Sequence, residues 1–266
     1  MTDLVSIVLI TYNRYSKLKE CIRSIRDQEY ENWELIIIND CSIDQTEQYL
    51  ESISSNNINI YHNSINKGLV VNLNIAISKA KGTLIARIDD DDKWVHRDKL
   101  SLQVNEFKSN QDLGLLGSSY KIDENEFQNP FSDKKIRMQM LFRCPFRHST
   151  VMFRKSSWLE AGKYNELIRY GEDWDLWLRI GKTYELKNLE TITAQITEGE
   201  NMSENNFKSQ LNLPFELLKE NRENYPLFRI AFIFHTFSKL VLTTLRKNSK
   251  IHILLKKIYR IIFLKG

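Results

Sequence analysis

The stretch LVSIVLI, Leu4 to Ile10, is apolar except at Ser6 and is rich in β-branched side chains. A short run of this kind predicts a strand that is buried on both faces, as strands of a parallel sheet are. The pattern returns in WELIIIN, Trp33 to Asn39, and in TLIARID, Thr83 to Asp89, while INIYH, Ile58 to His62, is a further strand. The N-terminal part of the chain therefore predicts one sheet of buried strands.

Helical patterns separate these strands. SKLKECIRSIRDQ places apolar side chains at helical spacing behind Ser16, which we expect to cap the helix. CSIDQTEQYLESI predicts a second helix, and GLVVNLNIAISKAKG a third, with Val71, Leu73 and Ile75 inward and Gly82 as a stop signal. This alternation predicts an α/β fold with a mostly parallel, Rossmann-like sheet flanked by helices. Its ligand crevice should lie at the carboxyl ends of the strands.

The second half of the chain is less regular. DLGLLGSSYKI predicts a strand, SDKKIRMQMLFR a helix, HSTVMFRKS a strand, and GEDWDLWLRIGK a short helix. We expect one domain over residues 1–222, with a regular half to about residue 115 and an irregular half from about 116 to 222. Residues 223–266 form a separate tail.

Composition narrows the class of protein. The 266 residues are 42% hydrophobic and 27% charged, which is typical of a globular protein and argues against disorder. An acid precedes the first apolar run, so a secretory signal is not expected, and no apolar run is long enough for a transmembrane helix. Cys21, Cys41 and Cys144 lack the spacing of a metal or disulfide framework, so we expect a cytoplasmic location.

Polar residues follow three of the predicted strands, and the crevice rule places them on one rim: Tyr12-Asn13, Asn39-Asp40 and Asp89 to Asp92. Four consecutive aspartates repel one another, so they either spread into water or surround a cation. A D-x-D behind a buried strand suits Mg²⁺ or Mn²⁺, whose preferred ligands are carboxylate oxygens. No glycine follows at the position that a calcium loop requires.

Two further groups have both a structural and a functional interpretation. The acids Glu172, Asp173 and Asp175 favour a helix N-terminus, where the helix dipole stabilises them, yet the nearby tryptophans could bury one of them and make it a general base. His148 begins a predicted strand and could be structural or functional. The chain contains neither GxGxxG nor GxxxxGK[ST], which argues against a dinucleotide fingerprint and a P-loop.

Taken in order, six segments resemble family 2 of the nucleotide-sugar glycosyltransferases, which have the GT-A fold. They are VSIVLITYNR, ELIIINDCSID, NKGLVVNLNIAISKAKG, IARIDDDDKW, HSTVMFRKS and GEDWDLWLR, and they span roughly residues 4 to 180. Each segment alone is weak evidence for the family, but six segments in the family's order and with suitable spacing are specific evidence for it. The resemblance is to bacterial enzymes of polysaccharide and glycolipid synthesis.

The resemblance implies roles for individual residues. Tyr12 would cover the nucleotide base, with Thr11 beside it. Asp40 would accept a hydrogen bond from the base imide, which favours uracil, and Asn74 would border the nucleotide pocket. The remaining roles fall on carboxylates: Asp89 and Asp90 at the ribose and diphosphate, Asp91 as the ligand of Mn²⁺ or Mg²⁺, and Asp173 as the general base.

The chain departs from the family pattern in three places. The acid-acid-glycine loop reads Asn39-Asp40-Cys41, which keeps the second acid but stiffens the loop. A Tyr-Arg-x-His segment of many relatives is replaced by residues of AQITEGENMS, which removes an expected phosphate or metal contact. Asp90 occupies a position that is usually small and uncharged.

The chemistry predicts an inverting transfer of a hexosyl or N-acetylhexosaminyl group. Neutralising the leaving diphosphate requires a cation, and the attacking hydroxyl of a saccharide or lipid-linked saccharide acceptor requires one base. One base and one metal suffice for direct displacement, which inverts the anomeric carbon. The alternative is a non-catalytic relative that binds nucleotide sugar and serves as a scaffold. The presence of both Asp91 and Asp173 argues against this alternative. A nucleotidyl- or phosphotransferase would release pyrophosphate instead.

The tail is basic and apolar. Nine Lys or Arg residues and no acid follow Glu223. We expect one apolar helical face formed by Ile230, Phe234, Phe237, Val241 and Leu245, and a second formed by Ile251, Leu254, Leu255, Ile258 and Ile262. Such helices could pack on the catalytic body, but their pattern favours peripheral binding to the inner face of the cytoplasmic membrane. The many large apolar side chains argue against nucleic acid as a partner.

Overall fold

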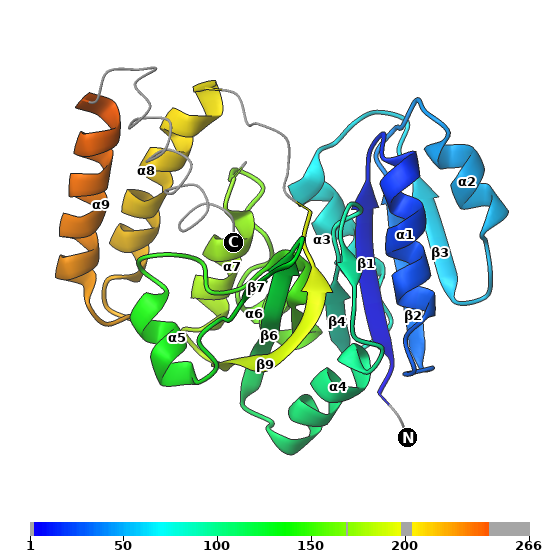
Figure 1. Cartoon of the computed structure of the whole chain (residues 1–266), viewed down its shortest axis with the longest axis horizontal. Helices are drawn as coiled ribbons and strands as arrows, with labels where there is room; N and C mark the ends of the chain where they lie inside the picture. Colours follow the sequence, from blue (N-terminus) through cyan, green and yellow to red (C-terminus); the bar gives the residue numbers. More distant parts are fainter. Residues whose placement is uncertain (1–2, 169, 198–203, 245–266) are drawn as a thin grey trace.

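The computed structural model of the chain describes residues 3–168, 170–197 and 204–244, which fold around one mixed β-sheet (Figure 1). The strands follow the order β3-β2-β1-β4-β8-β6-β9-β5, with β7 paired to β6. The predicted α/β architecture with a sheet flanked by helices is confirmed.

The N-terminal half of the sheet is parallel, as predicted. Its strands are β1 (Val5–Thr11), β2 (Trp33–Asn39), β3 (Ile58–His62) and β4 (Leu84–Arg87). In the register of these strands Thr11 pairs with Asn39, and Asn39 pairs with His62. The carboxyl ends of three neighbouring strands therefore lie level, which creates the rim expected from the sequence.

Side chains of each parallel strand alternate between two apolar layers because successive residues point to opposite faces of a sheet. In β1, Val5, Ile7 and Leu9 enter one layer, whereas Val8 and Ile10 enter the other. Helices α1 (Tyr15–Arg26), α2 (Thr46–Ser52) and α4 (Lys99–Ser109) contribute to the first layer, and α3 (Leu69–Lys79) contributes to the second. Burial on both faces explains why these strands are nearly continuous apolar runs.

The second half of the sheet is mixed. Strand β8 (Met152–Arg154) runs antiparallel to β4 and to β6 (Leu113–Ile122), and β9 (Glu185–Gln195) runs parallel to β6. Short strands β5 (Lys93–Trp94) and β7 (Asn125–Phe127) pair antiparallel with β9 and β6. The flanking helices are α5 (Asp133–Gln139), α6 (Lys155–Glu160) and α7 (Glu172–Ile180).

Three local predictions are wrong. Helix α1 begins at Tyr15 after Arg14, so Ser16 is not its cap. In α3 the side chains of Val70, Leu73 and Ile77 are buried, whereas Val71 and Ile75 are half-buried. This helix is apolar around most of its circumference, so spacing alone did not select its inner face.

The third error concerns HSTVMFRKS, predicted as one strand. His148–Thr150 form a turn of 3₁₀ helix, and only Met152–Arg154 extend as strand. The turn is held by side-chain bonds: the hydroxyl of Thr150 donates to the carbonyl of Arg147, and that of Ser149 donates to the carboxylate of Asp92. Hydroxyl side chains thus replace the strand ladder at the point nearest the rim.

The last two described helices, α8 (Glu204–Asn221) and α9 (Phe228–Thr244), lie at the end of the molecule opposite α2 and β3 (Figure 1). Ala231, His235 and Leu242 of α9 are buried, and His235 bonds the carbonyl of Leu141. One face of α9 therefore packs on the catalytic body.

The predicted apolar face of this segment is split. Phe234 and Val241 are half-buried, whereas Ile230 and Phe237 are exposed together with Ile233. Leu245 and the second predicted face, Ile251 to Ile262, lie outside the described residues. Of the helices in the described part of the chain, none has the length and apolar character needed to span a bilayer.

Candidate active site

The rim predicted from the strand ends forms as expected. The amide of Asp40 donates to the carbonyl of Thr11 at 2.9 Å, which joins the ends of β1 and β2. The amide of Ile88 donates to the carbonyl of Val8, which brings the Asp89 loop alongside. Thr11, Asp40 and the four aspartates thus converge on one edge of the parallel sheet.

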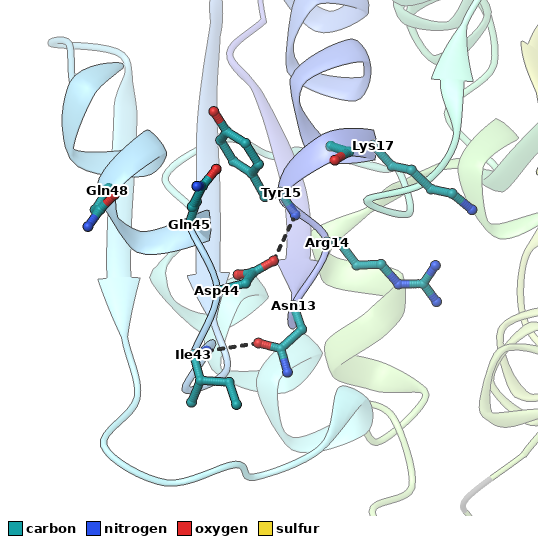
Figure 2. A pocket seen from close by; sticks show the side chains of 9 residues that line it. Asn13, Arg14, Tyr15, Lys17, Ile43, Asp44, Gln45 and Gln48 are labelled. Atoms are coloured by element: carbon teal, nitrogen blue, oxygen red, sulfur yellow. Dashed lines mark hydrogen bonds between the residues drawn. The ribbon is translucent and has the colours of Figure 1, made fainter.

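The loops after β1 and β2 are tied together by Asn13 (Figure 2). Its amide donates to the Ser42 hydroxyl at 2.9 Å, and its side-chain oxygen accepts the amide of Ile43 at 2.8 Å. The two loops and the first turns of α1 and α2 line a depression of about 650 Å³. Beside this bridge, Tyr12 is 47% exposed, so its ring presents an open face at the rim.

Cys41 follows Asp40 with φ at +65°, a conformation that favours glycine and is uncommon for other residues. The sequence indicated a stiffer loop here because cysteine stands where the family pattern has glycine. The structure keeps the glycine-type backbone with a side chain attached. Asp40 is therefore held by a strained but fixed loop.

The carboxylate of Asp40 is buried and strongly hydrogen-bonded. It accepts from the side chain of Asn63 at 2.8 Å and from the amides of Lys67 and Gly68 at 2.8 and 2.9 Å. Burial opposes its charge, but these bonds outweigh burial and hold the pKa of Asp40 below its usual value. Asn72 is a further hydrogen-bond donor to this carboxylate, so the protein itself supplies most of its acceptor contacts.

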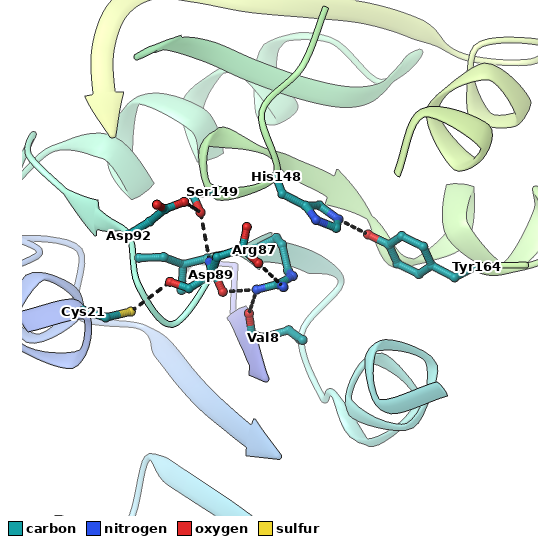
Figure 3. Close-up of polar contacts among 9 residues, drawn as sticks. Val8, Cys21, Arg87, Asp89, Asp92, His148, Ser149 and Tyr164 are labelled. Carbon is teal, nitrogen blue, oxygen red and sulfur yellow. Dashed lines mark hydrogen bonds and ion pairs between the residues drawn. The ribbon is translucent and has the colours of Figure 1, made fainter. Parts of the chain in front are cut away.

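Asp89 is neutralised by an arginine from its own strand (Figure 3). Arg87 is buried, contacts the carbonyls of Val8 and Ile88, and reaches Asp89 at 2.5 Å. Burial would raise the pKa of Asp89, but the charge and hydrogen bond of Arg87 and the charges of His148 and Arg14 together outweigh burial, so the pKa lies below its usual value. Asp89 is therefore an anion held at the rim.

Asp90 and Asp92 differ from Asp89, because the pKa of each is raised rather than lowered. Burial raises the pKa of Asp90 to about 6. Burial and the charge of Asp89 raise that of Asp92 to about 8, and Asp92 accepts bonds from the Ser149 hydroxyl at 2.5 Å and the Thr197 amide at 2.8 Å. Asp92 is thus an internal anchor of the loop that carries a proton near neutral pH.

Asp91 is the aspartate that faces two cations from another segment. Its Oδ2 lies 3.3 Å from Arg14 Nη1 and 3.9 Å from Lys17 Nζ, both from the start of α1. Its side chain is 17% exposed, and burial together with the charge of Asp89 raises its pKa. The second oxygen of Asp91 is without a side-chain donor among the described residues.

The carboxylates of the rim fit a hard divalent ion whose other ligands come from water and substrate. In the described part of the chain, no three His, Cys, Asp or Glu side chains converge to hold a metal by protein ligands alone. Mg²⁺ needs no such cage, because it is commonly held by one or two carboxylates, waters and substrate phosphates. Asp91 and the 35% exposed carboxylate of Asp89 can supply those oxygens.

Glu172 and Asp173 open helix α7 and are both buried. One oxygen of Asp173 accepts the Trp174 amide at 2.7 Å. Burial and the charge of Asp173 raise the pKa of Glu172 to about 8, so Glu172 holds a proton at pH 7. From the sequence, these acids could serve either to stabilise the helix N-terminus or to act as a general base. The burial of the acids that the nearby tryptophans indicated is present in the structure.

The backbone before α7 requires glycine. Gly171 has φ at +72°, and a Cβ at this position would lie 2.3 Å from Leu213 Cδ2 of α8. The glycine allows α8 to pack over the start of α7, which closes the acid pair on that side.

Hydrogen bonds join His148, Tyr164 and Asn74, close to both the acid pair and the rim. His148 Nε2 lies 3.0 Å from the Tyr164 hydroxyl (Figure 3). Asn74 on α3 donates to the carbonyl of Tyr164 and to Glu166, and accepts the Tyr164 amide. Burial and the charge of Arg87 lower the pKa of His148, whose neighbours also include the charges of Asp173 and Asp89. Asp173 and Asp89 thus face the same histidine.

Several residues of this site were not found from the sequence. They are Arg14, Lys17, Arg87 and Ser149. Arg87 carried a usable signal, because arginine is seldom fully buried without a partner and here it interrupts a buried strand. Arg14 and Lys17 lie beside the rim motif, but only the fold brings them to Asp91, which is far away in the sequence.

Comparison with known proteins agrees with this geometry. A sequence model of Glycosyl transferase family 2 matches residues 6–167. The UDP-Glc:alpha-D-GlcNAc-diphosphoundecaprenol beta-1,3-glucosyltransferase WfgD of Escherichia coli is 29% identical over 86% of this chain and 90% of its own length.

Two solved structures share the fold at low sequence identity. S. aureus TarS 1-349 in complex with UDP-GlcNAc is 17% identical, with a TM-score of 0.67 over 97% of this chain and 81% of its own. The mannosyltransferase PcManGT from Pyrobaculum calidifontis, in complex with GDP-Man and Mn²⁺, is 15% identical, with a TM-score of 0.62 over 97% of this chain and 86% of its own.

Proposed function

Because this chain belongs to glycosyltransferase family 2, we propose that it is an inverting, metal-dependent enzyme that uses a UDP-sugar donor. The transferred group is a hexosyl or N-acetylhexosaminyl unit, and the acceptor is a hydroxyl of a saccharide or lipid-linked saccharide. One observation carries the proposal: Asp89 of the rim and Asp173 of the buried acid pair both lie within electrostatic reach of the buried His148.

The donor side of the proposal rests on the rim. Tyr12 has an open ring face for stacking on a base, with Thr11 beside it. Asp40 is proposed to accept the imide N–H of uracil, which disfavours cytosine. Asp89 and Asp90 are proposed at the ribose and diphosphate. Asn74 acts through the Tyr164 segment that it fixes at the border of the crevice.

Asp91 is proposed as the carboxylate that holds Mn²⁺ or Mg²⁺. Such an ion, when bound, neutralises the charge that develops on the leaving diphosphate. The fold relative PcManGT was solved with Mn²⁺ and a nucleotide sugar, which supports a metal in this architecture. Arg14 and Lys17 already place two positive charges against Asp91, so the rim is prepared for anionic oxygens on the same side.

Asp173 is proposed as the base that removes the proton of the acceptor hydroxyl. Glu172 is protonated at neutral pH and so is not available as a base, which leaves Asp173 for this role. Direct attack on the anomeric carbon then needs no covalent intermediate and inverts its configuration. The alternative, a scaffold that binds donor without transfer, would have no use for this acid pair.

A donor screen tests the proposal. We expect UDP-sugars with Mn²⁺ to raise the melting temperature more than GDP- or CMP-sugars do, because Asp40 recognises uracil. Turnover with acceptor should release free UDP. Release of pyrophosphate would instead identify a nucleotidyltransferase, and stabilisation by GDP-sugars alone would remove Asp40 from base recognition.

The chain is proposed to divide into a donor half to about residue 115, an acceptor half from 116 to 222, and a tail over 223–266 that binds the inner face of the cytoplasmic membrane peripherally. Ile230, Ile233 and Phe237 are exposed on α9, and nine cations without an acid follow Glu223. Each such cation contributes about 1 kcal/mol near an anionic surface. WfgD is named for a lipid-linked acceptor, and an acceptor of that kind would lie at the membrane surface to which the tail would bind.

Vesicle sedimentation checks the membrane proposal. The full chain should sediment with vesicles containing phosphatidylglycerol, and high salt should release only part of it because apolar contacts persist. A variant ending at Thr244 keeps α9 on the body but loses seven of the cations, and it should bind more weakly. Ile233→Ser with Phe237→Ser should weaken the salt-resistant part. If the full chain ignores anionic vesicles, the tail is a packing element.

A further inference from the structure

Two arginines beside the acid pair have no acidic partner. Arg147 is 8% exposed, and Arg143 is half-buried. They lie on the irregular segment that follows α5 and leads into His148. Neither guanidinium forms an ion pair with a carboxylate within the described ranges. Buried cations are normally paired, so this pair requires an explanation.

The contacts of both side chains fix their position without neutralising them. Arg143 donates from Nε and Nη2 to Gln139 Oε1, at 2.9 and 2.7 Å. Arg147 donates from Nη2 to the hydroxyl of Tyr120 at 2.8 Å and stacks 4.7 Å from the centre of its ring. Tyr120 in turn stacks on Phe127, with the ring centres 5.2 Å apart. Both guanidiniums are thus oriented by neutral groups.

The two cations are close enough to affect each other. Burial and the charge of Arg147 lower the pKa of Arg143. Two like charges in a partly desolvated position are unfavourable unless an anion joins them. In the described part of the chain, Arg147 Nε and Nη1 donate to no protein group, so they remain for a ligand.

Cys144 shows where this pair lies relative to the proposed chemistry. Its buried thiol is within electrostatic reach of Asp173 and of both arginines. Arg147 directly precedes His148, which is itself within electrostatic reach of Asp173, whereas Arg14, Lys17 and Arg87 contact the rim.

The same segment packs against the inner face of α9. The carbonyl of Leu141 is bonded to His235 of α9 at 2.9 Å, and the ring of Phe142 lies 5.9 Å from that of Phe234. The segment that carries the arginines therefore contacts a helix whose outer face carries Ile233 and Phe237.

We propose that Arg143 and Arg147 bind a phosphate group of the acceptor, so that the acceptor is a saccharide attached to its lipid through phosphate or diphosphate. The inference rests on the proposed function and names the substrate class of the same site. A guanidinium binds phosphate oxygens in a bidentate manner, and the two arginines offer donors from two directions. The lipid chain would then extend toward α9.

Isopentenyl diphosphate, a soluble prenyl diphosphate, is the probe. Calorimetry is done on the full chain with Mg²⁺, both without UDP and saturated with UDP. We expect the probe to bind in both conditions, and we expect Arg147→Gln and Arg143→Gln each to weaken it roughly tenfold or more, as for a lost charged hydrogen bond. Uncharged isopentenol should not bind.

Matched variants separate binding from folding. Lys134→Gln removes an exposed cation from neighbouring α5 and should leave probe affinity unchanged. Tyr120→Phe removes the bond to Arg147 but keeps its ring, so it should weaken the probe less than Arg147→Gln does. Melting temperatures of all variants show whether each remains folded.

Two outcomes overturn the inference. If UDP displaces the probe, or if the Arg147 and Arg143 variants lose UDP affinity, the arginines serve the donor diphosphate. If the probe fails to bind the folded wild type, the pair is not an acceptor phosphate site. Failure of UDP itself to bind, with probe binding intact, would refute the proposed donor and leave the arginine site standing.

Discussion

Asp173→Asn is expected to bind UDP-sugar as the wild type does and to transfer sugar at least a hundredfold more slowly, roughly the range for removal of a general base. The amide has nearly the same shape, and it can still accept the Trp174 amide through its oxygen, so the start of α7 should keep its structure. It cannot take the proton of the acceptor hydroxyl. Donor affinity by calorimetry and transfer by release of UDP separate the two effects.

Glu172→Gln is the matched control because it changes the neighbouring acid in the same buried position. Burial and the charge of Asp173 raise the pKa of Glu172 to about 8, so at pH 7 the wild-type side chain is already neutral. An amide resembles that state, and we expect most of the activity to remain. Equal losses in both variants would mean that the pair supports the fold. A loss confined to Glu172→Gln would reassign the base.

The parallel half of the fold could be predicted from sequence because β1, β2 and β4 are buried on both faces and are nearly continuous apolar runs. WELIIIN and INIYH coincide with β2 and β3, and the rim follows from the direction of the strands. The irregular half could not be predicted in this way. HSTVMFRKS was predicted as a strand, but the bond of Ser149 to the distant Asp92 and that of Thr150 to Arg147 form a turn at its start.

The candidate site was predicted in part, and the reason is visible at the four aspartates. Residue types identified the carboxylates but not how their repulsion is relieved. Arg87 pairs with Asp89, Arg14 and Lys17 face Asp91, and Asp92 carries a proton near neutral pH because burial and the charge of Asp89 raise its pKa to about 8. These partners come from other segments, so sequence spacing does not reveal them. The protein thus relieves most of the repulsion itself, and one carboxylate keeps an oxygen that has no side-chain donor among the described residues and is left for an added cation.

That carboxylate is Asp91, and Asp91→Ala is expected to abolish the part of UDP affinity that depends on Mn²⁺. The diphosphate loses its counter-ion when the ion loses its charged protein ligand. Calorimetry with UDP in the presence and absence of Mn²⁺ measures this part directly, without any need for acceptor or turnover.

The residual affinity of this variant is informative as well. Without Asp91, Arg14 and Lys17 lose their nearest acid and can turn to the diphosphate, so we expect UDP to bind weakly and independently of metal. Asp98→Ala, which removes a half-buried aspartate beyond the loop, is the control and should keep the full response to Mn²⁺. If Asp91→Ala responds to Mn²⁺ as strongly as this control does, the ion is held elsewhere, and Asp91 serves only to position the two cations at the start of α1.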